Sequence, residues 1–240
     1  MTYTDYLSAA EMTRWLIDVD IAWDNIDERI ALSQADVLQR VRDSALIESF
    51  FPIFTPRVLD LLWDWPTATA IFSVQLYESY KHFQVFNQYL EAVDFKPVTD
   101  DEIVAVRQAQ VGLRFTNRAR LLTRYMMSEH FAAYNFFKDH RIAVEPVLAQ
   151  ILHLVAKDEV RHCQFAYELL RDLLQSEPEL KGDVLDEARQ FKHLGELVLP
   201  AVPVAHKNDF AAIVAVNRKV QRLTGQSLGR SRAQLTEVTF

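Results

Sequence analysis

The sequence predicts an all-α protein built around a bundle of four long helices. Turn-forming residues are scarce: the 240 residues include 5 glycines and 8 prolines, about 5% of the chain against roughly 12% in average usage. Apolar residues recur at intervals of three and four along four long stretches, which is the period of an α-helix. The breaks between neighbouring stretches are short, as in antiparallel helical hairpins. A sandwich or barrel would need many more turns.

We expect the first hairpin to consist of helices over residues 37–64 and 67–93. Apolar side chains follow the helical spacing from Leu46 to Leu62. Trp65-Pro66-Thr67 separates the two helices, because proline disfavours a helical residue before it and suits the first turn of the next helix. Trp63 and Trp65 are expected to pack where this hairpin closes.

The second hairpin is expected from residues 100–138 and 144–174. Thr99 followed three residues later by Glu102 is a capping box, which marks the start of a helix. Pro146 suits the first turn of the fourth helix. One longer crossover should join the two hairpins.

Further helices are expected on both sides of the bundle. Residues 5–31 read as one additional amphipathic helix, residues 183–199 as another, and 208–223 as the last. The tail from residue 225 onward is polar and is expected to be loose. No composition shift marks a boundary, so we expect one domain over 1–240 with its core in about 37–200.

Composition and charge exclude several classes of function. The net charge is −7, which offers no basic stripe for nucleic acid. Cys163 is the only cysteine, so neither a disulfide framework nor a thiolate zinc cluster is expected. The chain shows no secretory signal and no apolar run of membrane-spanning length. We therefore expect a cytoplasmic protein with no nucleic-acid or membrane partner.

Acidic residues inside apolar helical faces are the main functional signal, because an unpaired buried carboxylate is costly. Each of the four long helices carries one such glutamate, and two helices add a histidine one turn later. The set is Glu48, Glu78, His82, Glu129, Glu159 and His162.

The spacing of the glutamates repeats between the hairpins. Glu48 and Glu78 are 30 residues apart, and so are Glu129 and Glu159. In antiparallel helices with a rise of 1.5 Å per residue, each pair falls at matching depth near mid-helix. Four carboxylates and two imidazoles at one level form the ligand set of a di-iron or di-manganese site. Oxygen and imidazole ligands favour two iron ions, with manganese as the alternative.

Three segments resemble the ferritin-like di-iron carboxylate superfamily: residues 78–90, 128–132 and 156–167, which include the D-E-x-R-H motif at Asp158–His162. The resemblance spans roughly residues 40–200. It is greatest to soluble acyl-carrier-protein desaturases, and more distant to ribonucleotide reductase small subunits.

This resemblance implies a ferritin-like four-helix bundle that activates dioxygen at two metal ions. The implied function is a desaturase- or hydroxylase-type oxidase or oxygenase acting on an apolar or carrier-bound organic substrate, with an external electron donor. Glu48, Glu129 and Glu159 would be the catalytic carboxylates. Asp158 and Arg161 would orient the histidines.

One departure from that family leaves two alternatives. When His82 is aligned with His162, Ser79 falls opposite Glu159, and Glu78 falls opposite Asp158, one residue early and about 100° around the helix. Either Glu78 coordinates a metal after local adjustment of its helix, or the site lacks one carboxylate. The competing function is therefore a non-catalytic bundle with a degenerate, partly occupied or empty metal site. The sequence also leaves open which substrate is used and whether the protein is a homodimer.

Overall fold

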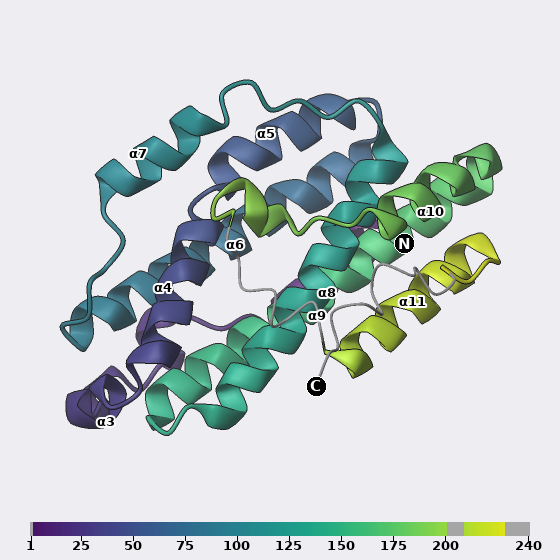
Figure 1. Ribbon diagram of the computed structural model, residues 1–240. Coiled ribbons are helices and arrows are strands. Elements are labelled where there is room, and N and C mark those ends of the chain that lie inside the picture. Colours follow the sequence, from purple (N-terminus) through teal and green to yellow (C-terminus); the bar gives the residue numbers. More distant parts are fainter. Residues whose placement is uncertain (1, 201–208, 229–240) are drawn as a thin grey trace, which may run out of the picture.

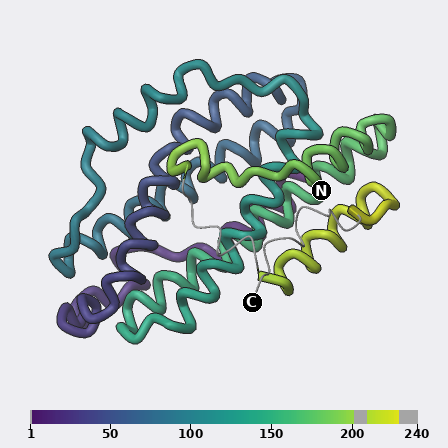
Figure 2. Tube along the Cα trace, in the orientation of Figure 1, coloured from purple at the N-terminus to yellow at the C-terminus, as the bar shows by residue number. Residues whose placement is uncertain are grey.

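The computed structural model describes residues 2–200 and 209–228, and the chain is helical without strands in these ranges (Figure 1). Four helices form the central bundle: α4 (Ala35–Glu48), α6 (Pro66–Ala92), α8 (Arg118–Ile142) and α9 (Pro146–Ser176). Helix α8 packs along α9, α4 packs on α6, and α6 also contacts α9. The Cα trace in Figure 2 shows α8 and α9 side by side over most of their length. The predicted all-α bundle is confirmed.

The helix expected over 37–64 is wrong as one element, because the chain breaks it after Glu48. Helix α4 ends there and α5 (Phe51–Leu61) begins three residues later. Pro52 has no N–H group to donate to the carbonyl of Glu48, so a continuous helix would lose that hydrogen bond. Ser49 is the C-cap residue of α4, and its hydroxyl donates to the Leu46 carbonyl at 2.7 Å.

The helix expected over 100–138 is also two elements. Its capping box is confirmed, since Thr99 and Glu102 cap each other at the start of α7 (Asp100–Ala109). Residues 110–117 then leave the helix, and Asn117 caps α8 by accepting a hydrogen bond from the Arg120 N–H at 2.9 Å. The crossover between the hairpins therefore runs from residue 93 to residue 117 and carries α7 along the outside of the bundle (Figure 1).

The segment 5–31 is not the single amphipathic helix that its pattern predicts. It forms α1 (Tyr3–Met12), α2 (Ile17–Asp20), a 3₁₀ turn (Trp23–Asn25) and α3 (Glu28–Leu32). The chain turns repeatedly because Tyr6 and Trp15 insert into the bundle, where they are 1% and 3% exposed.

At the other end of the chain, the expected helix over 183–199 stops early. After a 3₁₀ turn (Pro178–Leu180), α10 (Lys181–Arg189) is followed by an extended stretch and a second 3₁₀ turn (Leu194–Leu197). Helix α11 (Phe210–Thr224) matches the last predicted helix. Residue 208, Pro203 and most of the tail lie outside the described residues. No helix in the described ranges has both the length and the hydropathy of a membrane span.

An aromatic cluster at the centre of the bundle joins α1, α6, α8 and α9. Phe165 contacts Tyr6, Phe72 and Tyr125, with ring centroids 5.0, 5.5 and 5.7 Å away. All four rings are at most 1% exposed. Trp63, by contrast, is 75% exposed, so the expectation that it packs at the hairpin is wrong.

Truncation of Phe165 should therefore destabilise the whole bundle. Phe165→Ala removes a ring that touches three helices and leaves a cavity, which is expected to cost about 3–5 kcal/mol. Trp63→Ala is the matched control and should change the free energy of unfolding by less than about 0.5 kcal/mol. Guanidinium unfolding of both variants measures the difference, and similar costs for the two would contradict the packing described.

Candidate metal centre

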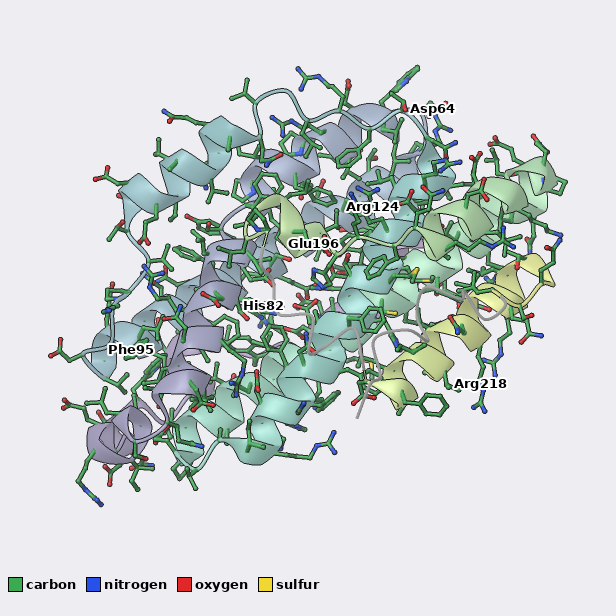
Figure 3. All side chains as sticks on the ribbon, in the orientation of Figure 1. Asp64, His82, Phe95, Arg124, Glu196 and Arg218 are labelled. Carbon is green, nitrogen blue, oxygen red and sulfur yellow. The ribbon has the colours of Figure 1, made fainter. Side chains whose placement is uncertain are left out.

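The six side chains that the sequence singles out are all buried at mid-bundle. Glu48 ends α4, Glu78 and His82 lie on α6, Glu129 lies on α8, and Glu159 and His162 lie on α9. None is more than 6% exposed. Figure 3 shows the central position of His82, with Arg218 on the outside of α11. The equal spacing in the two hairpins therefore brings residues from four helices to one level.

Two groups of three side chains converge closely enough to hold a metal ion each. Glu48, His82 and Glu159 form one group, and Glu129, Glu159 and His162 form the other. Within each group the potential ligand atoms lie within 4.8 Å of one another. Glu159 belongs to both groups, which is the position of a bridging carboxylate. Glu129 and Glu159 thus lie well inside the separation of about 8 Å that one shared two-metal site allows.

The first group contains three buried atoms without a hydrogen-bond partner: Glu48 Oε2, His82 Nδ1 and Glu159 Oε1. His82 Nδ1 and Glu159 Oε1 approach to 3.0 Å, but not with hydrogen-bonding geometry. Buried polar groups almost always find a partner. Three unpartnered ligand atoms that face one another are the arrangement that a bound cation satisfies.

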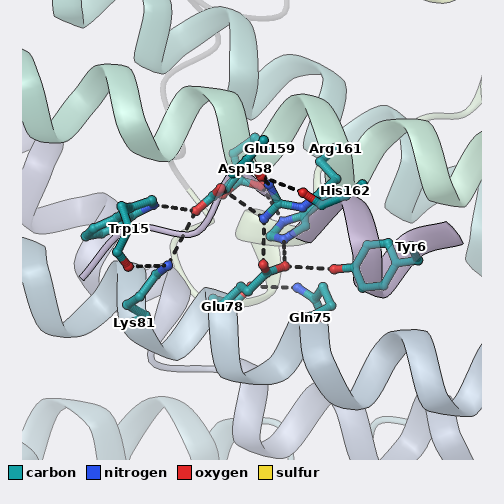
Figure 4. A network of polar contacts seen from close by, with 12 residues as sticks. Tyr6, Trp15, Gln75, Glu78, Lys81, Asp158, Glu159, Arg161 and His162 are labelled. Carbon is teal, nitrogen blue, oxygen red and sulfur yellow. Dashed lines mark hydrogen bonds and ion pairs between the residues drawn. The ribbon is translucent and has the colours of Figure 1, made fainter. Parts of the chain in front are cut away.

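A carboxylate of the opposite helix contacts the Nε2 atom of each histidine. Figure 4 shows this contact between Glu78 and His162. His82 Nε2 lies 3.1 Å from Asp158 Oδ2, and His162 Nε2 lies 2.9 Å from Glu78 Oε2. Arg161 joins the two carboxylates, because its Nη2 lies 2.6 Å from Glu78 Oε1 and 2.9 Å from Asp158 Oδ1. Both rings therefore turn Nδ1 toward Glu159 and Nε2 outward.

This arrangement places Glu78 outside both groups of potential ligands. Glu78 supports His162 as Asp158 supports His82, which matches the alignment that puts Glu78 opposite Asp158. Ser79 is 1% exposed and lies on the inner side of α6. Its hydroxyl accepts a hydrogen bond from Gln75 Nε2 at 2.6 Å. The other amide atom of this glutamine, Oε1, is buried without a partner.

Sequence reasoning missed two aromatic residues of the N-terminal segment that complete this network. The Tyr6 hydroxyl donates to Glu78 Oε2 at 2.7 Å, and the Trp15 indole N–H donates to Asp158 Oδ2 at 2.8 Å. Lys81 Nζ lies 4.0 Å from the Trp15 ring and 3.8 Å from Asp158 Oδ2. Lys81 is 8% exposed, so its charge is buried beside Asp158.

Burial and mutual charge separate the pKa values of the three central carboxyl groups. Burial raises the pKa of Glu48 to about 8, and the nearby charge of Glu159 adds to the rise. Burial, together with the charge and hydrogen bonding of Glu159, also raises the pKa of Glu129. Burial opposes the ionisation of Glu159, but hydrogen bonding with Glu129 and the charge of His162 bring its pKa well below the usual value.

The pKa values of the two histidines and of Glu78 are shifted so that their charged forms are favoured. Burial lowers the pKa of His82, but its hydrogen bond to Asp158 and the nearby charge of Glu159 outweigh this effect and raise the pKa to about 10. The pKa of His162 rises to about 9, because Glu159 and Glu78 outweigh burial. The pKa of Glu78 falls to about 2 despite burial, through His162 and Arg161. Protons on the histidines thus balance the carboxylates where no metal ion is bound.

A cavity of about 80 Å³ lies beside this centre and is lined by residues of α4, α5, α8 and the segment 193–198. Glu48 and Glu129 are part of its lining. Apolar side chains make up much of the rest, together with polar ones such as Arg40, Asp43 and Asp139. The apolar lining comprises Ile47, Phe50, Phe51, Phe54, Ala132, Phe136, Leu194 and Val198.

Comparison with solved structures identifies the fold. An R2-like ligand-binding oxidase from Sulfolobus acidocaldarius superimposes with a TM-score of 0.69 at 13% identity, over 95% of this chain and 93% of that one. A variant of an R2-like ligand-binding oxidase with an anaerobically reconstituted Mn/Fe cofactor gives a TM-score of 0.54 at 14% identity, over 99% of this chain and 86% of that one. The chain has the ferritin-like fold. Neither a protein-family model nor a curated protein matches the sequence.

Loss of Arg161 should be far more damaging than loss of an exposed arginine of the same helix. Arg161→Met leaves Glu78 and Asp158 buried without their shared cation, and breaking a buried ion pair in this way costs about 3–5 kcal/mol. Arg171→Met removes an exposed partner of Glu168 and should cost less than about 1 kcal/mol. Urea unfolding measures the loss in free energy of unfolding for both variants. Equal losses would contradict the buried ion pairs of Arg161 described here.

Proposed function

We propose that this protein is an oxygen-activating oxidase with a two-metal centre, holding two iron ions or an Mn/Fe pair. The observation that carries the proposal is the convergence of Glu48 Oε2, His82 Nδ1 and Glu159 Oε1, three buried ligand atoms without partners. Carboxylate oxygens with imidazole nitrogens suit iron and manganese. The fold shared with R2-like ligand-binding oxidases, one of them carrying an Mn/Fe cofactor, supports the same proposal.

In this proposal Glu48, Glu159 and His82 hold one ion, and Glu129, Glu159 and His162 hold the other. Such a pair of ions supplies the redox chemistry that reduces dioxygen. The chain's own residues position the ligands: Asp158 and Glu78 fix the orientation of the two imidazoles and keep Nδ1 directed inward. The aromatic cluster around Phe165 excludes water from one side of the centre.

The apolar cavity that opens on Glu48 and Glu129 supports an apolar substrate or the apolar part of a carrier-bound one. A desaturase- or hydroxylase-type reaction fits this position, because the carbon atoms held among Phe50, Phe51 and Phe136 would lie next to the metal ions. The proposal includes an external electron donor, since full reduction of dioxygen requires electrons beyond those of the substrate. It also includes a cytoplasmic location, without a nucleic-acid or membrane partner. A homodimer is compatible with it.

Ser79 favours a second candidate, a bundle whose metal site is only partly filled. Four carboxylates would neutralise two divalent ions, whereas three leave a residual positive charge in a buried site, which is costly. In this candidate the ion near His82 is bound weakly or lost, and the ion held by Glu129, Glu159 and His162 is retained.

Removal of the shared carboxylate tests the first candidate. The parent protein, reconstituted anaerobically with ferrous iron, should bind close to two ions per chain and gain near-ultraviolet absorption on exposure to dioxygen. Glu159→Ala should lose both ions and the absorption, because Glu159 lies in both groups. Glu168→Gln, on the same helix, is the control and should behave as the parent protein. Metal analysis after desalting gives the readout, and full iron retention by Glu159→Ala would contradict the proposed centre.

Substitutions on α6 decide between a missing carboxylate and an adjusted Glu78. Ser79→Glu restores a fourth carboxylate on the inner face of the helix and should tighten the weaker of the two iron-binding steps in an anaerobic titration. Glu78→Gln keeps the hydrogen bond to His162 and should leave the number of bound ions unchanged. If Glu78→Gln loses one ion while Ser79→Glu binds like the parent, Glu78 is itself a ligand and no carboxylate is missing.

A further inference from the structure

We propose that the cavity beside the metal centre selects a substrate that carries a protonated amine at the end remote from the metal ions, with Asp43 as the partner of that amine. This inference rests on the proposed function, in which the cavity receives the substrate. Three observations support it. The cavity is lined by polar residues away from the metal centre, Arg40 is already paired with other residues, and Asp43 forms no ion pair within the described part of the chain.

The two ends of the cavity differ, because the residues that α4 and α8 contribute change along each helix. On α4 it is lined by Arg40, Asp43, Ser44, Ile47 and Glu48, which are spaced as one face of a helix. On α8 the lining runs from Ser128 and Glu129 to Asp139. Glu48 and Glu129 therefore mark the metal end, and Arg40, Asp43 and Asp139 mark the opposite end. A substrate whose apolar carbon atoms react at the metal ions would place its polar group at that opposite end.

Arg40 is the cation of the outer end, but protein acceptors already occupy its guanidinium group. Its Nε and Nη2 both lie 3.0 Å from Asp139 Oδ1. Its Nη1 donates to the carbonyl oxygen and to Oδ2 of Asp36, each at 3.2 Å. Two carboxylates thus neutralise this single positive charge, and few donors remain for an anionic substrate.

Asp43 has a negative charge that no cationic side chain among the described residues neutralises. Its Oδ1 accepts a hydrogen bond from Gln39 Nε2 at 2.8 Å, and it forms no ion pair with any residue in the ranges 2–200 and 209–228. Arg40, Asp36, Asp43 and Asp139 together carry a net negative charge. An ammonium group would form a charge-assisted hydrogen bond with Asp43, whereas a carboxylate at the same place would be repelled.

The spacing along α4 sets the length of the substrate between its amine and its reacting carbon. Asp43 and Glu48 are five residues apart, about 7.5 Å along the helix axis. A charge-assisted hydrogen bond takes up about 2.8 Å of that distance. The remaining 5 Å or so corresponds to about four bonds of an extended chain, and the cavity volume of about 80 Å³ suits such a short chain.

Two probes of equal length isolate the charge of the head group. Butylamine is protonated at pH 7, as a lysine side chain is, while butan-1-ol is neutral and can only hydrogen-bond. Isothermal titration of the metal-loaded protein should show butylamine binding about tenfold more tightly than butan-1-ol, the ratio expected for one charge-assisted hydrogen bond. Equal affinities for the two probes would overturn the proposal.

A pair of substitutions attributes the preference to Asp43. Asp43→Asn keeps an acceptor for Gln39 and should reduce the affinity ratio to about one. Asp60→Asn, which removes an exposed charge from α5, is the control and should retain the tenfold ratio. A preference that persists in Asp43→Asn would also overturn the proposal, because the amine would then bind elsewhere, for example to a metal ion.

Metal analysis of the same samples separates this proposal from the function on which it rests. Two bound ions without any amine preference would overturn the assignment of Asp43 alone. An amine preference that depends on Asp43, in a protein that binds no iron or manganese, would instead overturn the oxidase proposal. Thermal unfolding of both aspartate variants verifies that each retains the parent fold.

Discussion

The structure depends on balancing the charge of carboxylates and imidazoles that are buried at one level of a helical bundle. Glu159 lies at the centre, close to both histidines, and burial together with the charge of Glu159 raises the pKa values of Glu48 and Glu129. Arg161 balances two further carboxylates behind the histidines. The N-terminal segment bends sharply because its two buried aromatic side chains donate hydrogen bonds to these same carboxylates. The surrounding packing is thus organised around charges that burial would otherwise make costly.

The centre has an approximate internal symmetry, and one residue breaks it. Helices α6 and α9 each provide a histidine whose Nδ1 faces inward, and each provides the carboxylate that supports the histidine of the other helix. At the next position α9 has Glu159, which lies in both groups of potential ligands, whereas α6 has Ser79. Under the proposed function, two similar halves with unequal charge would hold two metal ions with unequal affinity. The size of this inequality would distinguish a working oxidase from a bundle whose metal site is only partly filled.

Much of this arrangement could be predicted from the sequence, because its signals are local. The equal 30-residue spacing of the glutamates gave the common level of the site, and alignment of His82 with His162 placed Glu78 beside Asp158. Pro52 was a local signal for the break after Glu48, but the continuous apolar periodicity favoured a single helix. No local signal indicated the roles of Tyr6 and Trp15, since each hydrogen-bonds to a residue more than 70 positions away. The cavity and its charged end likewise depend on how α4 and α8 meet.

The central claim is that two metal ions lie between the four central helices, bridged by Glu159. Crystals of the protein soaked anaerobically in ferrous iron, with diffraction data collected on both sides of the iron absorption edge, test it most directly. The account predicts anomalous peaks on either side of the Glu159 carboxylate, one next to Glu48 and His82 and one next to Glu129 and His162, with the peak near His82 the weaker. The absence of anomalous density at both positions, in crystals that bind iron elsewhere or not at all, would contradict it.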